Sequence, residues 1–400
     1  NMSTAPKGFR FATACAGFRK EGRADLALLV SDVPAVAAGT FTQNRFPAAP
    51  VLVAKAMLAE RPAARAVVIN SGQANACTGD EGMRNCRTTQ ELVAGALGLE
   101  ASDILPASTG VIGAQLKMDL WEKAAPALAA NLGKATPEDF ARAIMTTDAF
   151  HKISHREVSL PGGVVKLVGM AKGAGMICPN MATMLGFLTT DAAITTPMLQ
   201  KALKLAVDDT FNMVSVDGDT STNDMVSIMA NGMAENPVID KEGADFDLFV
   251  AVVKEICTSM AKKIAGDGEG ATKLVECTVT GAPTIPLAKA IAKSVITSSL
   301  TKAAMFGADA NWGRILCAIG YTEGDFAVDT IQVDISSPKG SILVCENGAG
   351  VAFDEDKAKE ILLEDAIHIE IAMKQGDASA TAWGCDLTYD YVKINGDYRT

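Results

Sequence analysis

Short aliphatic runs alternate irregularly with amphipathic segments along this chain. The strand-like runs cover residues 25–30, 66–69, 163–170, 225–229, 331–335 and 367–372. In segment 248–264, apolar residues recur at three- and four-residue steps, the period of an α-helix, and segments 81–98, 117–132 and 287–305 are also helix-like. Because sheets and helices must bury their apolar faces against one another, the pattern predicts a mixed α/β protein built in layers.

Several helix ends are marked in the sequence. Thr136-Pro137 and Thr196-Pro197 each place a capping hydroxyl before a proline at the first helical position. We expect these helices to end near residues 145 and 208. The 248–264 helix should end at the turn-rich segment 266–270 and should pack its apolar stripe against a sheet. From residue 330 onward, strands separated by Gly and Asp turns are expected.

Composition and charge narrow the classes of function. With 48% hydrophobic residues, the 400-residue chain can bury one large core or two smaller ones. The formal net charge is −11 and no dense basic run is present, which argues against a nucleic acid partner. Segment 173–190 carries no charge, but its glycines, Pro179 and Asn180 favour buried irregular chain and a strand over a membrane span. Because residues 1–23 contain no apolar segment of signal-peptide length, we expect a cytoplasmic protein without a membrane partner.

Motifs for metals, nucleotides and disulfides are weak. Nine cysteines occur without a CxxC pair and only three histidines are present, so we expect neither a disulfide framework nor a metal site. In the glycine-rich segment 266–273, Thr272 precedes Lys273, the reverse of the order in a phosphate-binding loop. The acidic segment 217–224 lacks the spacing of a calcium loop, which favours a solvated turn.

The segment Lys172–Leu185 has a different character. A glycine-rich stretch runs through Pro179-Asn180 to Ala182 and Thr183, which could expose one peptide bond. If the Thr183 hydroxyl attacks the Ala182 carbonyl, an N-to-O acyl shift and hydrolysis leave Thr183 as a new N-terminus. Its α-amine, with an ordinary pKa of ~7.7–8.0, can then act as the base for its own hydroxyl. The competing interpretation is a β-branched residue in a buried strand.

Acyl transfer also needs donors for a tetrahedral oxyanion. Segment 106–113, with Ser108, Thr109 and Gly110, offers a hydroxyl and backbone N–H groups after a strand. Segment 70–79 is a second polar loop of the same character. Taken alone, each is equally an ordinary hydrogen-bonded turn.

These residues resemble those of the ornithine acetyltransferase family, the bifunctional glutamate N-acetyltransferases of arginine biosynthesis. The resemblance covers nearly the whole chain, through segments 5–9, 70–79, 108–110, 146–148, 172–190, 311–314 and 395–400. It implies autoproteolysis between Ala182 and Thr183 into an α chain, residues 1–182, and a β chain, residues 183–400. Shared in proportion to length, 41.6 kDa gives fragments of about 19 and 23 kDa.

The resemblance also implies an architecture. Sheets and helices should be layered as in self-cleaving enzymes with an N-terminal nucleophile, with a smaller C-terminal α/β region and an internal boundary at about residue 280. The β chain should begin with a strand that enters the core. The α and β chains should stay associated, with two of each forming a heterotetramer.

The resemblance further implies a ping-pong reaction without a cofactor. N-acetylornithine acetylates Thr183, ornithine leaves, and glutamate takes the acetyl group to become N-acetylglutamate; use of acetyl-CoA as a donor stays open. Thr109 and Gly110 match the oxyanion hole. The matched substrate contacts are Thr146, Thr147, Lys172, Thr183, Glu269, Asn395 and Thr400, and the sequence does not separate Thr146 from Thr147. Lys172 suits a carboxylate and Glu269 an ammonium, whereas each taken alone reads as a solvated loop residue.

Two other functions stay open from the sequence. Aminopeptidases with a self-cleaving Thr or Ser are related, but they pass the acyl group to water. An unprocessed binding or assembly protein would keep amino-acid recognition through Lys172 and Glu269 without turnover. The mass of the purified chain separates the second alternative from the enzymes, because a binding protein would stay uncut.

Overall fold

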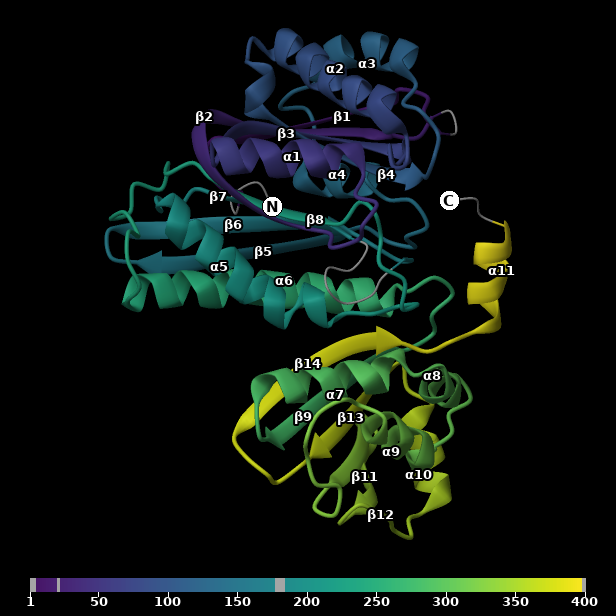
Figure 1. Cartoon of the computed structure of the whole chain (residues 1–400). Helices are drawn as coiled ribbons and strands as arrows, with labels where there is room; N and C mark the ends of the chain where they lie inside the picture. Colours follow the sequence, from purple (N-terminus) through teal and green to yellow (C-terminus); the bar gives the residue numbers. More distant parts are fainter. Residues whose placement is uncertain (1–4, 20–21, 177–183, 398–400) are drawn as a thin grey trace.

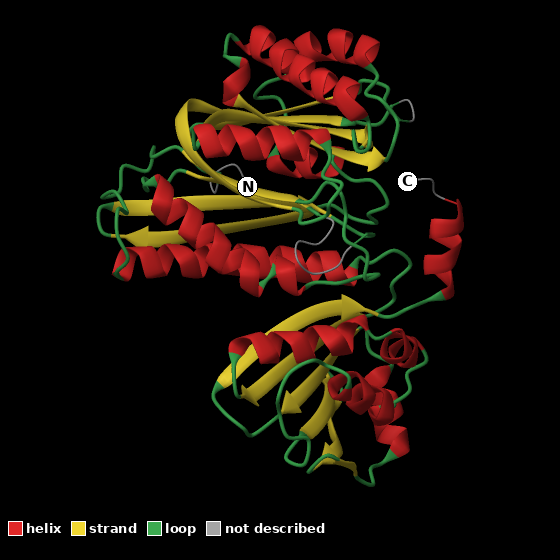
Figure 2. Ribbon diagram, viewed as in Figure 1, coloured by secondary structure: helices red, strands yellow, loops and turns green. Residues whose placement is uncertain are grey.

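A computed structural model describes residues 5–19, 22–176 and 184–397 of the chain. In this part of the chain, strands assemble into an eight-stranded sheet and a six-stranded sheet (Figures 1 and 2). The first has the order β4-β3-β2-β8-β7-β6-β5, with β1 paired to β2. Its strands are β1 (Phe9–Ala14), β2 (Leu26–Phe41), β3 (Ala63–Gln73), β4 (Ile104–Val111), β5 (Lys152–Leu160), β6 (Gly163–Lys172), β7 (Leu185–Thr190) and β8 (Met225–Ala230).

The long strand β2 folds the first sheet back on itself (Figure 1). Its first part pairs with β1 and β3, and its last part pairs with β8. The register with β3 shifts between Val30 and Ala35, a stretch that includes Pro34. Because proline lacks an N–H, the ladder is interrupted there and the strand can bend.

Apolar layers fill the space inside and outside this folded sheet. Between its two halves, Phe140 packs its ring edge-on against Phe11 and Phe187, one from each half. Helices α2 and α3 cover the outer face of β1–β4, and α5 and α6 cover the outer face of β5–β8 (Figure 2). The helices of this region are α1 (Ala49–Glu60), α2 (Gly79–Leu97), α3 (Met118–Ala130), α4 (Pro137–Ala143), α5 (Thr196–Asp209) and α6 (Ala244–Gly266).

The second sheet lies on the other side of α6 (Figure 1). Its order is β12-β11-β10-β13-β9-β14, and its core is continuous with the residues that α6 buries. Its strands are β9 (Leu274–Ala282), β10 (Gln332–Ser337), β11 (Gly340–Glu346), β12 (Ala349–Gly350), β13 (Ala366–Ala372) and β14 (Ala378–Cys385). Its helices are α7 (Ile285–Thr297), α8 (Ser299–Phe306), α9 (Trp312–Gly320) and α10 (Glu355–Leu362), and α11 (Tyr389–Asp397) ends the described chain.

The structure confirms the layered α/β architecture with a smaller C-terminal α/β region. Helix α4 starts after Thr136, whose hydroxyl forms a capping box with Asp139. Helix α5 begins at Thr196 itself with Thr195 at the cap, so the predicted cap was wrong by one residue. The predicted 287–305 helix is two helices, because Ser298 leaves the helical conformation and caps α8 by accepting from Thr301 N–H.

Candidate active site

A cavity of about 450 Å³ lies where the ends of β4 and β6 meet the segments that lead into β8 and out of α6. All the predicted site residues that the structure describes line it: Thr109, Gly110, Thr146, Thr147, Lys172, Glu269 and Asn395. They come from segments far apart in the chain. Ala182, Thr183 and Thr400 lie outside the described residues.

Backbone geometry at the end of β4 fixes the two oxyanion candidates. Gly110 has φ +133°, and a Cβ there would lie 2.3 Å from the Gly72 carbonyl carbon, so this position requires glycine. The buried Asn223 amide donates to the carbonyl of Ser108 at 2.8 Å. Because that carbonyl and the Thr109 N–H belong to one peptide plane, Asn223 also fixes the direction of this N–H.

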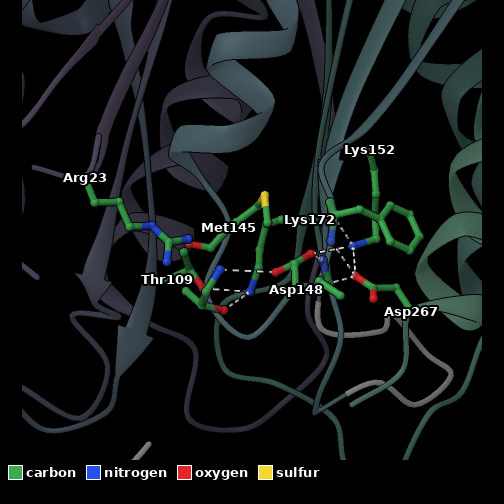
Figure 3. A network of polar contacts seen from close by, with 11 residues as sticks. Arg23, Thr109, Met145, Asp148, Lys152, Lys172 and Asp267 are labelled. Carbon is green, nitrogen blue, oxygen red and sulfur yellow. Dashed lines mark hydrogen bonds and ion pairs between the residues drawn. The ribbon is translucent and has the colours of Figure 1, made fainter. Parts of the chain in front are cut away.

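Lys172 ends β6 and is buried, with 4% of its surface exposed. Its Nζ donates to Thr109 Oγ1 at 3.1 Å and to Thr146 Oγ1 at 2.9 Å (Figure 3). It is therefore not the solvated loop lysine that its local sequence suggests. An ammonium group can only donate, so each threonine oxygen accepts here and its hydroxyl proton is free for a different acceptor.

Three charged side chains pack behind Lys172 and join β5 to the end of α6 (Figure 3). Lys152 Nζ donates to Asp148 Oδ2 at 2.6 Å and to Asp267 Oδ2 at 2.8 Å, and the Lys152 side chain is 0% exposed. Asp148 also accepts from the backbone N–H groups of Thr146, at 3.1 Å, and Gly173, at 2.9 Å. This cluster fixes the segments on both sides of Lys172.

Burial and charge shift the acid constants of this part of the site. Burial alone would raise the pKa of Asp148, but the positive charges of Lys172 and Lys152 outweigh it and hold the pKa at about 2. Burial lowers the pKa of Lys172, although the charges of Asp148 and Glu269 oppose the shift. Asp148 is thus an anion at neutral pH and provides the negative charge that a buried ammonium needs.

The lining of the cavity also includes acidic side chains. Glu269 is 6% exposed, and burial raises its pKa, although hydrogen bonding from Thr147 and Asn395 opposes the shift. A Cβ on Gly175 would lie 1.7 Å from Glu269 Oε1, so a side chain at this position would displace the carboxylate. The turn that the sequence suggested for Glu269 is present, but its side chain points inward. Thr146 thus contacts the lysine and Thr147 the carboxylate, a distinction that the sequence does not make.

The acidic segment 217–224 is not simply the solvated turn that its spacing favours. Gly218 and Asp219 are exposed, but Asp217 Oδ2 accepts from Met176 N–H at 2.8 Å and from the Tyr391 hydroxyl at 3.1 Å. These bonds turn the segment inward, and Asp217 lines the cavity together with Tyr391.

Asp224 is a candidate functional residue that the sequence reasoning missed. It is fully buried just before β8, where its Oδ1 accepts from Met184 N–H at 2.9 Å. Among the described residues, its Oδ2 has no hydrogen-bond partner. Burial raises the pKa of Asp224 well above its ordinary value, although the Met184 N–H and the charge of Lys172 oppose the shift. Buried carboxyls with strongly shifted pKa values cluster at functional sites, which makes Asp224 a candidate. The sequence does not reveal it, because its burial depends on contacts between distant segments.

Within ranges 5–19, 22–176 and 184–397, no three His, Cys, Asp or Glu side chains are placed to hold a metal ion. In the same ranges, no helix has the length and apolar character needed to cross a membrane.

The layered frame and this cavity define an α/β protein with a site suited to small zwitterions, because a buried ammonium with two threonine hydroxyls and several carboxylates line the same cavity. The chain belongs to the ArgJ family, which it matches over residues 10–400. It is 53% identical over 400 residues, 100% of both chains, to the arginine biosynthesis bifunctional protein ArgJ of Nitratidesulfovibrio vulgaris.

Two further comparisons agree with this family. The ArgJ protein of Thermotoga neapolitana is 48% identical over 396 residues, 99% of each chain. A crystal structure of the ArgJ protein of Bacillus halodurans is 46% identical, covers 53% of this chain and 98% of that chain, and superposes with a TM-score of 0.51.

Proposed function

We propose that this chain is a self-processing acyltransferase of arginine biosynthesis that moves an acetyl group from N-acetyl-L-ornithine to L-glutamate. Membership of the ArgJ family supports the reaction. The main structural support for the site is that seven predicted residues, from distant segments, line one cavity.

Self-cleavage comes first in this proposal. The Thr183 hydroxyl attacks the Ala182 carbonyl carbon, the peptide C–N bond breaks, and the acyl group moves from nitrogen to oxygen. Water then hydrolyses the ester, which leaves a carboxylate on Ala182 and a free α-amine and hydroxyl on Thr183. The chain becomes an α part, residues 1–182, and a β part, residues 183–400.

Acetyl transfer follows by a ping-pong route. Thr183 Oγ attacks the acetyl carbonyl of N-acetylornithine while the Thr183 α-amine takes the hydroxyl proton and passes it to the leaving ornithine nitrogen. Thr109 and Gly110 hold the tetrahedral oxyanion. The amine of glutamate then attacks the acetyl-threonine ester, and N-acetylglutamate leaves with Thr183 restored.

The charges of the cavity suit these substrates. Two N–H groups of Lys172 are used by Thr109 and Thr146, so the third can meet a substrate carboxylate. Glu269 can accept the side-chain ammonium of ornithine. Thr147, Asn395 and Thr400 complete the proposed substrate contacts.

The proposal also covers the assembly of the protein, its location and its cofactor requirement. The two parts stay associated, two copies of each form a heterotetramer in the cytoplasm, and no cofactor is required. Acetyl-CoA is a second acetyl donor to be tested on the same nucleophile. Sedimentation of the purified protein measures the assembly, and a pair of αβ units is the expected species.

Kinetics with labelled N-acetylornithine test this function. We expect label in N-acetylglutamate, parallel reciprocal plots when glutamate is varied at several donor concentrations, and no transfer by Thr183→Ala. Release of labelled acetate at the same rate without glutamate would indicate a hydrolase of the aminopeptidase kind. An uncut chain that binds ornithine without turnover would indicate a binding protein.

A further inference from the structure

The buried charge cluster behind Lys172 has no part in the proposed reaction steps. Asp148, Lys152 and Asp267 do not line the cavity. Lys152 is nevertheless fully buried with both carboxylates within 2.8 Å. Because burying an ion pair costs desolvation free energy, such a cluster contributes little net stability. Its position next to Lys172 therefore suggests that it acts on the site.

Asp148 holds the chain on both sides of Lys172. Its Oδ1 accepts from Thr146 N–H, and Thr146 Oγ1 in turn accepts from Lys172 Nζ. Its Oδ2 accepts from the N–H of Gly173, the residue directly after Lys172. Lys152 occupies the same oxygen at 2.6 Å and so fixes the carboxylate plane (Figure 3). The position of the Lys172 ammonium therefore depends on Asp148.

Lys172 in turn decides where the Thr109 hydroxyl proton points. Thr109 Oγ1 accepts from the ammonium at 3.1 Å, so its own hydrogen cannot point toward Lys172. Accepting a bond from a cation also polarises the O–H group and makes it a stronger donor. Since Thr109 lines the cavity, this proton can be donated to a substrate oxyanion bound there.

We propose that Asp148, held by Lys152, is a positioning residue of the acetyl transfer, acting through Lys172 to aim the Thr109 hydroxyl proton at the tetrahedral oxyanion. This inference rests on the proposed function. Asp267 completes the charge balance, because two carboxylates then face the two buried ammonium groups.

The inference predicts the direction in which the pKa of Lys172 changes when a neighbouring charge is removed. The charged groups that act on Lys172 are Asp148, Glu269, Lys152, Arg19 and Asp224. Removing the Asp148 charge should lower the pKa of Lys172, and removing the Lys152 charge should raise it. A purely structural cluster would instead loosen the site in the same way in both variants.

A double-mutant cycle tests the route through Thr109. We expect Asp148→Asn to lower kcat for acetyl transfer roughly 10- to 100-fold, with a smaller change in KM. In a Thr109→Ala background, the same substitution should cost almost nothing, because its target is gone. The matched control is Asp208→Asn, at a half-buried carboxylate that pairs with Lys204, and it should keep the parent kcat. An equal decrease of kcat in both backgrounds, or a change in KM alone, would overturn the inference.

A second measurement does not depend on activity. In protein labelled with ¹³C at lysine Cε, the Lys172 titration should move to lower pH in Asp148→Asn, to higher pH in Lys152→Met, and not at all in Asp208→Asn. Shifts in one common direction, or none, would overturn the inference. Circular dichroism checks that each variant is folded, because unfolding alone would raise the pKa of Lys172 by exposing it to water. If Asp148→Asn does not fold, the upward shift expected in Lys152→Met decides. If the parent protein transfers no acetyl group, the proposed function fails, and this titration still decides whether Asp148 controls Lys172.

Discussion

The Thr109 hydroxyl can be tested as an oxyanion donor by removing it. It accepts from Lys172 and faces the cavity, so Thr109→Ala should lower kcat about 10²- to 10³-fold, which corresponds to ~2.7–4 kcal/mol of transition-state stabilisation. Thr109→Ser keeps the hydroxyl and is the matched control, with a kcat close to that of the parent. Steady-state kinetics measure both, and an unchanged kcat in Thr109→Ala would exclude this role.

The buried carboxyl of Asp224 should make stability depend on pH. Burial raises its pKa in the folded protein, so it favours folding at low pH, and this contribution is lost as the pH rises through the folded-state pKa. Asp224→Asn removes the ionisation and keeps the shape. Thermal unfolding at pH 5 and pH 8 should show the variant gaining a few degrees over the parent at pH 8 and less at pH 5. A larger gain at pH 5 would contradict this sign.

The site residues show which functional side chains can be predicted from the sequence alone. Lys172 and Glu269 were identified only through a family resemblance, because locally each looks like an exposed loop residue. Thr109 was a candidate on local chemistry, but its segment looks equally like an ordinary turn. Their burial comes from distant partners: Lys172 reaches Thr109 across 63 positions. Lys152 and Asp148 stand four apart, but Asp267, the second partner of Lys152, lies 115 positions away. No local pattern predicts such a cluster.

Helix α11 carries one wall of the site although none of its residues is buried. It is held by the Tyr391 hydroxyl, which donates to Asp217 at 3.1 Å. Tyr391→Phe should therefore raise KM for N-acetylornithine several-fold with little change in kcat, because a bond to a charged group contributes ~1.5–3 kcal/mol at most. Tyr389→Phe is the matched control, since Tyr389 is 83% exposed and contacts Phe306 only through its ring.

Truncation before Asn395 should have a larger effect than Tyr391→Phe. Asn395 lines the cavity, and Thr400 is a proposed substrate contact. A truncated protein that keeps the parent KM and kcat would contradict the placement of the C-terminal segment at the site.

Elements were predictable where the signal is local. The capped start of α4 and the apolar stripe of α6 follow directly from residue order. The shifted cap of α5 and the break at Ser298 were missed, because several hydroxyl residues compete for the cap and helical periodicity continues across the break. Helices α10 and α11 were also missed in a region expected to be mostly strands, since α10 is short and α11 buries no residue.

The whole molecule depends on α6, which packs against strands of both sheets. Phe249 on α6 belongs to the core that continues into the second sheet and is 0% exposed. Phe249→Ala should lower the free energy of unfolding by ~3–5 kcal/mol, and both sheets should lose structure in the same transition. Urea unfolding followed by circular dichroism measures this change. The neighbouring Leu248 is 45% exposed, so Leu248→Ala should change stability by no more than ~0.5 kcal/mol.

At this scale, the sequence predicted the layers but not their arrangement. The strand run at 25–30 marks only the first part of β2, and its continuation past Pro34 folds the sheet. That fold brings the end of β4 near the end of β6 and so creates the cavity. The second sheet also packs on α6, and its formation likewise depends on pairing between distant strands, such as β9 with β13. Neither feature has a local signal.

The most direct test of the proposed function is the intact mass of the denatured protein, measured before and after incubation with N-acetylornithine alone. We predict two chains of about 19 and 23 kDa, from 41.6 kDa in total, with one acetyl group added to the larger chain on Thr183. Thr183→Ala should give one uncut chain without acetyl. An uncut parent chain, or a cut protein that never gains an acetyl group, would contradict the account.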